Sequence, residues 1–151
     1  MYRSLLTLLL AAALSACATT APSRDAQASA DKLRFAEKAY QDGLFVEAES
    51  YYRELVADNP ELYEGWFRLG NIYARTGQLD AAITMYERCL DLDPDQARAW
   101  YNLALVRTRQ SLRTLADAEQ RFADQPADQR RLAALRERLV EALTSKGGEQ
   151  Q

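Results

Sequence analysis

The sequence predicts an all-α protein in which antiparallel helical hairpins stack into a solenoid that ends in a capping helix. From residue 29 onward the chain resembles itself at a spacing of 34 residues, which places Gly43 on Gly77 and Pro60 on Pro94. Apolar residues within each unit recur at i, i+3 and i+7, the spacing of one helix face. A glycine separates the two apolar stripes of a unit, where a turn between helices is needed.

Residues 1–16 have the pattern of a signal peptide. Arg3 gives a positive start, and the uncharged run Leu5–Leu14 follows it. That run is ten residues long, whereas a membrane-spanning helix needs about 20 apolar residues. We therefore expect a cleaved signal and not a permanent span.

The signal ends at Leu14-Ser15-Ala16-Cys17, which resembles the lipobox of bacterial lipoproteins. This resemblance implies cleavage before Cys17 and lipidation of its thiol. Ala18, in place of a retaining aspartate, implies transport to the periplasmic face of the outer membrane. The alternative is an ordinary secretory signal followed by an unrelated cysteine.

Residues 17–28 are expected to be the lipidated cysteine and a flexible tether, because residues 18–28 are small and polar without apolar periodicity. The solenoid is expected over residues 29–146, and residues 147–151 are expected to be a frayed tail.

Two complete units are expected, at residues 29–62 and 63–96. The second has the fuller pattern. Trp66 and Tyr73 share an apolar stripe, while Gly70 leaves room for a second helix. This pattern and its period resemble the tetratricopeptide repeat (TPR). In the first unit Lys32 replaces the signature tryptophan, as expected of a terminal repeat whose outer face meets water.

A third, degenerate unit begins at residue 97. It opens with Trp100, but no glycine or proline lies between Ala97 and Gln125. Because helix ends usually carry such signals, we favour one helix over residues 97–123; the alternative is a third hairpin that turns near residues 109–113. Pro126 then introduces a capping helix over residues 127–145.

The composition argues against catalysis, metal binding and nucleic-acid binding. The chain has no histidine and two cysteines, and its formal net charge is −3. Asp91, Asp93 and Asp95 resemble a calcium loop only superficially, since the required glycine and glutamate are missing. We expect no catalytic residue, metal or cofactor.

By resemblance to the TPR family, the first helix of each unit would line a concave groove that holds a peptide or a helix of a partner protein. The alternative is that these residues form ordinary solvated helix faces. The expected lining is Leu33, Glu37, Tyr40, Phe67, Arg68, Asn71, Arg75, Arg98, Tyr101, Asn102 and Leu105.

Asn71 and Asn102 fall where some TPR domains clamp a C-terminal carboxylate, and each amide can donate and accept. Phe67, however, stands in place of a lysine of that clamp. We therefore expect an internal or amphipathic segment of the partner in the groove.

Charge is divided along the expected solenoid, with a net −7 over residues 31–97 and +4 over residues 98–146. The positive part could meet an acidic partner, although solvated arginines are the commoner explanation. Small TPR lipoproteins resemble pilotins and pilus-assembly lipoproteins of type IV or tight-adherence type. That implies an assembly factor that binds a secretin or another pilus or secretion component; the alternative is a periplasmic scaffold that recruits cell-wall enzymes or other envelope proteins.

Overall fold

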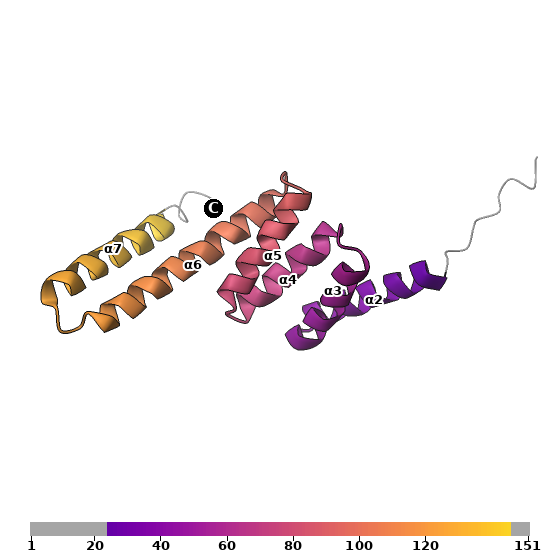
Figure 1. Ribbon diagram of the computed structural model, residues 1–151, viewed down its shortest axis with the longest axis horizontal. Coiled ribbons are helices and arrows are strands. Elements are labelled where there is room, and N and C mark those ends of the chain that lie inside the picture. Colours follow the sequence, from indigo (N-terminus) through magenta and orange to yellow (C-terminus); the bar gives the residue numbers. More distant parts are fainter. Residues whose placement is uncertain (1–23, 146–151) are drawn as a thin grey trace, which may run out of the picture.

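The computed structural model describes residues 24–145, and this part of the chain folds into six α-helices without a strand. Figure 1 shows them following one another along a single direction. The all-α solenoid is therefore confirmed. The expected signal peptide, Cys17 and the tail 147–151 lie outside the described residues. The helices are α2 (Arg24–Gln41), α3 (Phe45–Asp58), α4 (Tyr63–Arg75), α5 (Leu79–Leu92), α6 (Ala97–Arg121) and α7 (Pro126–Ser145).

The first two hairpins, α2–α3 and α4–α5, turn in the same way. Gly43 has φ 75° and Gly77 has φ 79°, a backbone conformation that favours glycine. The amide of Leu44 donates to the carbonyl of Ala39 at 2.9 Å, and the amide of Gln78 donates to that of Tyr73 at the same distance. The sequence spacing of the two glycines thus reflects one repeated turn.

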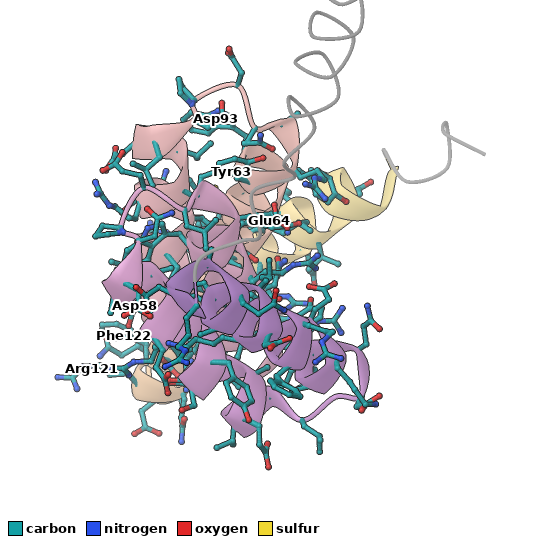
Figure 2. All side chains as sticks on the ribbon, turned by 90° about the vertical axis from the view of Figure 1, so that its right-hand side faces the viewer. Asp58, Tyr63, Glu64, Asp93, Arg121 and Phe122 are labelled. Atoms are coloured by element: carbon teal, nitrogen blue, oxygen red, sulfur yellow. The ribbon has the colours of Figure 1, made fainter. Side chains whose placement is uncertain are left out.

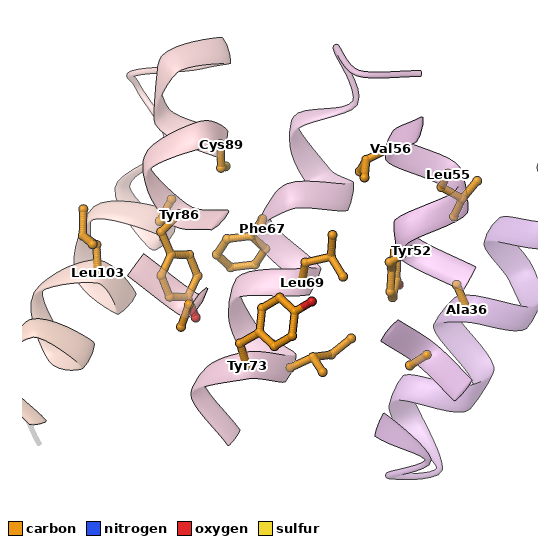
Figure 3. Close-up of a cluster of buried hydrophobic side chains, with 14 of the residues drawn as sticks. Ala36, Tyr52, Leu55, Val56, Phe67, Leu69, Tyr73, Tyr86, Cys89 and Leu103 are labelled. Carbon is orange, nitrogen blue, oxygen red and sulfur yellow. The ribbon is translucent and has the colours of Figure 1, made fainter. Parts of the chain in front are cut away.

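The helices pack closely where the sequence has small residues. Ala36, Ala48, Ala82 and Ala99 are fully buried. A Cβ added to Gly70 would lie 2.6 Å from the ring of Tyr86, so these two helices approach too closely for any side chain at that point. Figure 3 shows the resulting core, which runs through the hairpins as one cluster.

Residues 97–121 form one continuous helix, α6, as favoured from the sequence over a third hairpin. The capping helix α7 folds back along the second half of α6, as Figure 1 shows. Nε of Arg136 on α7 donates to the Glu119 carboxylate on α6 at 2.8 Å. A second helix of the third unit is thus replaced by the end of α6 and by α7.

One sequence expectation needs correction, and Trp100 differs from Trp66, the residue at the same place in the unit before it. Helix α2 begins at Arg24, so residues 24–28 are helical and not part of a flexible tether. Trp100 is not packed like its counterpart: it is 53% exposed, since α6 continues where a second helix would cover it. Both tryptophans still donate their indole N–H to a proline carbonyl, Trp66 to Pro60 at 2.9 Å and Trp100 to Pro94 at 2.8 Å. None of the described helices is long and apolar enough to cross a membrane.

Candidate functional site

A pocket of about 420 Å³ lies between the first helices of three successive units, α2, α4 and α6. We call it the α2–α4–α6 pocket. One residue of the second helix α5 also reaches it. Its lining is Tyr40, Asn71, Ala74, Arg75, Tyr86, Asn102, Leu105, Val106 and Arg109.

Two hydrogen bonds meet at one atom in this pocket. Oδ1 of Asn71 accepts from the Tyr86 hydroxyl at 2.8 Å and from Nδ2 of Asn102, also at 2.8 Å. Burial raises the pKa of Tyr86 to about 12, so its hydroxyl stays a donor at neutral pH. The network leaves the amide N–H groups of Asn71, and one N–H and the carbonyl oxygen of Asn102, for a ligand.

The charged groups of the pocket are both positive. The Arg75 guanidinium lies 5.7 Å from the ring centre of Tyr40 and 5.9 Å from that of Phe45, close enough for cation–π contact. Arg109 extends from α6 into the same lining. No carboxylate lines the pocket, and neither arginine has an ion-pair partner within residues 24–145.

A cluster of alternating charges lies beside the pocket, which we call the ion-pair cluster: Glu37, Arg68, Glu64 and Arg98. Nη2 of Arg68 is 3.1 Å from Glu37, and its Nε is 3.2 Å from Glu64. Nη2 of Arg98 is 3.7 Å from the other oxygen of Glu64. Figure 2, in which α2 faces the viewer, labels Glu64. The cluster neutralises two arginines of this face.

A second pocket, of about 690 Å³, runs along α2 and is called here the α2 pocket. Leu33, 42% exposed, gives it an apolar surface. Glu37 and Glu64 lie at its border with the ion-pair cluster. The concave face therefore has an apolar region at its start and a positive region further along.

The expected groove residues are thus divided among these places. Leu33 and Glu37 line the α2 pocket, while Arg68 and Arg98 belong to the ion-pair cluster. Tyr101 is 65% exposed and lines neither pocket. The α2–α4–α6 pocket brings together the remaining polar and apolar positions, Tyr40, Asn71, Arg75, Asn102 and Leu105.

Phe67 is a correction. The sequence places it in the lining of the groove, but its side chain is buried with 6% of its surface exposed. Its ring centre lies 6.0 Å from that of Tyr86, and the Arg98 guanidinium covers it at 5.0 Å. Phe67 is part of the core because α5 packs over it.

Four lining residues were not predicted from the sequence: Ala74, Tyr86, Val106 and Arg109. Arg109 follows Arg75 by 34 residues, so the repeat period could have identified it. Nothing in the sequence indicates that the Tyr86 side chain extends to the pocket, because its position in the second helix of a unit normally indicates core packing alone.

The site is suited to non-covalent binding. Within residues 24–145 no three His, Cys, Asp or Glu side chains gather as a metal site. Cys89 is buried and without a disulfide. Burial raises its thiol pKa to about 11, so the thiol stays protonated and unreactive at neutral pH.

Comparisons with known proteins agree with this architecture. A family model described as tetratricopeptide repeat matches residues 33–88, and a second, described as TPR repeat, matches residues 70–111. The peroxisomal targeting signal receptor of Yarrowia lipolytica (strain CLIB 122 / E 150) is 34% identical over 76 residues, which span 50% of this chain and 13% of that receptor. This chain thus matches only a small part of the receptor's length.

Among solved structures, the chain is similar to the TPR2B domain in the pHsp70 complex of yeast Sti1, with a TM-score of 0.52. The match covers 76% of this chain and 97% of that one, at 17% sequence identity. At this identity the likeness concerns the fold. A TPR fold of this kind is a scaffold for protein interaction.

Proposed function

We propose that the tetratricopeptide repeats carried by this chain hold a segment of a partner protein against α2, α4 and α6. The observation that carries the proposal is the α2–α4–α6 pocket, which spans three successive units. An isolated pocket on one helix pair would take a small group, whereas a surface continued over several units suits an extended or helical segment.

The chemistry of the face supports a peptide ligand. The Asn71 amide N–H groups and the Asn102 carbonyl oxygen can pair with backbone groups of a bound chain. Leu105, 40% exposed, and Tyr101 add apolar contact area. The names of the similar proteins, a targeting signal receptor and a complex with pHsp70, are consistent with this kind of binding.

Photo-crosslinking tests which face binds. A photoreactive phenylalanine analogue at Leu105 lies in the pocket, and the same analogue at Val46, 80% exposed on α3, is a matched control. We expect adducts with a protein from the native envelope at Leu105 and none at Val46. Adducts at Val46 alone would move binding to another face and contradict the proposal.

We further propose that the chain is anchored by lipid at the periplasmic face of the outer membrane. The support is the Leu14–Cys17 segment and the alanine after it. Globomycin, or Cys17→Ser, should block maturation and release the protein from membranes. Cys89→Ser is the matched control and should remain attached. Unchanged attachment of Cys17→Ser would contradict the lipid anchor.

For the partner, we propose a secretin or another pilus or secretion component, so that the protein acts as an assembly factor. The support is that the sequence resembles a small TPR lipoprotein, a kind of protein similar to the pilotins. The second candidate is a scaffold that recruits cell-wall enzymes or other envelope proteins. Mass spectrometry of the Leu105 adducts separates the two, and a secretin and pilins encoded beside this gene would favour the first.

A further inference from the structure

We infer that the α2–α4–α6 pocket selects an acidic side chain within an internal segment of the partner, and that its carboxylate sits between Arg75 and Arg109. This inference deepens the proposed function and rests on it. It names the chemistry that distinguishes one peptide from another at this site.

The charge balance of the concave face carries the argument. Arg68 and Arg98 are each paired with a carboxylate of the ion-pair cluster. Arg75 and Arg109 have no such partner within the described chain, and no carboxylate lines their pocket. Two cations facing one cavity repel each other, so an anion between them is favoured.

The two guanidinium groups are also placed to act together. Arg75 and Arg109 occupy equivalent positions of successive units. The rings of Tyr40 and Phe45 hold the Arg75 guanidinium by cation–π contact. Arg75, Arg109 and Tyr86 line the same pocket.

The groups that remain for a ligand are mainly donors. A guanidinium has five N–H donors and no acceptor. Asn71, which also lines the pocket, has its Oδ1 occupied by other residues, so its amide N–H groups are further donors. A carboxylate is an acceptor with two oxygens, and its hydrogen bonds to guanidinium are among the stronger ones in proteins. A basic or amide side chain would lack this match.

An internal residue fits better than a chain terminus. The Asn102 amide already gives one of its two N–H groups to Asn71, so only one remains for a carboxylate. Apolar surface is present on both sides of the pocket, with Tyr40 on α2 and Leu105 on α6. A bound chain can therefore continue in both directions.

Peptide selection with the detergent-solubilised full chain tests the inference. Random dodecapeptides fused to the amino end of a phage coat protein have no free carboxyl terminus, so any acidic preference must come from side chains. We expect the selected peptides to be enriched in Asp and Glu. The double variant R75Q/R109Q should select peptides without this enrichment, while R113Q/R130Q, which removes two exposed arginines outside the pocket, should retain it.

Affinity gives a second readout. Replacing the selected acidic residue by its amide should weaken binding to the native chain about tenfold or more, since a hydrogen bond to a charged group is lost. The same replacement should have little effect on binding to R75Q/R109Q. Circular dichroism of every variant establishes that helical content is unchanged.

The outcomes separate the two proposals. Selected peptides without acidic enrichment, or enrichment that persists in R75Q/R109Q, overturn the inference and leave peptide binding intact. Failure to select any peptide contradicts peptide binding itself. Binding of phosphatidylglycerol–phosphatidylcholine vesicles through Arg75 and Arg109, without peptide selection, would assign the pocket to lipid and overturn both.

Discussion

The hydroxyl of Tyr86 donates a hydrogen bond of 2.8 Å to Oδ1 of Asn71, an atom that also accepts from Asn102 of the next unit. A single acceptor therefore joins the two helices of one hairpin to the first helix of the following unit. Because Tyr86 and Asn71 both line the α2–α4–α6 pocket, the contact that stabilises the stack also shapes the binding surface.

The preceding unit repeats this relationship with different chemistry. Tyr52 donates to Glu37 at 2.8 Å, and Glu37 also accepts from Arg68 of the next unit at 3.1 Å. Each of the three residues precedes its counterpart, Tyr86, Asn71 or Asn102, by 34 positions. The repeat thus preserves a shared acceptor residue between hairpins: one neutral amide oxygen takes both hydrogen bonds in one unit, and the two oxygens of a carboxylate take one each in the other.

Removing the two hydroxyls should have unequal effects on stability. Y86F loses a bond between neutral groups and should lower the free energy of unfolding by about 1 kcal/mol, whereas Y52F loses a bond to a carboxylate and should lower it by about 2 kcal/mol. Urea unfolding followed by circular dichroism measures both. Y101F is the control, because the Tyr101 ring is largely exposed, and its stability should be unchanged. Equal losses for Y52F and Y86F would contradict the charged role of Glu37.

Alkaline pH should destabilise the fold through buried tyrosines. Burial raises the pKa of Tyr86 to about 12 from an ordinary value of 10.0, and burial also raises the pKa of Tyr52 and Tyr73. The unfolded chain then loses these protons at lower pH than the folded chain. The stability that these tyrosines contribute is therefore fully present below about pH 10 and falls as pH rises from about 10 toward 12.

Urea unfolding at intervals between pH 8 and pH 11 checks this decline. Burial also raises the Cys89 thiol pKa to about 11 from 9.0, so its contribution begins to fall about one unit earlier. The variant Y86F should show a shallower decline above pH 10 than the native chain. A free energy of unfolding that stays constant to pH 11 would be inconsistent with these raised pKa values.

The hairpins could be predicted from the sequence because their determinants are local. Gly43 and Gly77 mark turns that need a left-handed backbone, and the buried alanines mark close helix contacts. The absence of such signals between Ala97 and Gln125 correctly favoured one long helix. These features depend on residues that are near one another in the chain.

The candidate site was only partly predictable, since it depends on contacts between units. Family position placed Asn71 and Asn102 on the concave face, but not the hydrogen bond between them, which uses one acceptor and one donor. The same reasoning wrongly placed Phe67 on the groove surface, because how far α5 covers α4 depends on tertiary packing. Arg109 could be predicted only as one of several arginines in the positive part of the chain, because a charge without an ion-pair partner becomes visible only once all neighbouring carboxylates have been placed.

Gly70 should tolerate no side chain. The added Cβ of G70A would lie 2.6 Å from the Tyr86 ring, so the helices would have to move apart, at a cost of about 1–3 kcal/mol. Thermal unfolding measures the loss. In a Y86L background the substitution should cost less, because the atoms that collide are absent, and a double-mutant cycle should show that coupling. Additive effects would mean that this contact is not what requires glycine.

Phe67 and Tyr101 occupy equivalent positions 34 residues apart, yet they should have opposite roles. F67A empties a core site that is 6% exposed and should lower the free energy of unfolding by about 3–5 kcal/mol. Y101A removes a ring that is 65% exposed and should change stability by less than about 0.5 kcal/mol. Urea unfolding separates the two variants.

In variants that fold correctly, ligand binding should depend more on Tyr101 than on Phe67. Y101A should reduce adducts from the Leu105 photo-crosslinker, because a contact beside the pocket is lost, while its circular dichroism spectrum stays native. The conservative replacement F67L keeps most of the core volume and should retain the adducts. Undiminished adducts with Y101A would contradict this role, because they would show that the Tyr101 ring does not contribute to ligand contact at the Leu105 position.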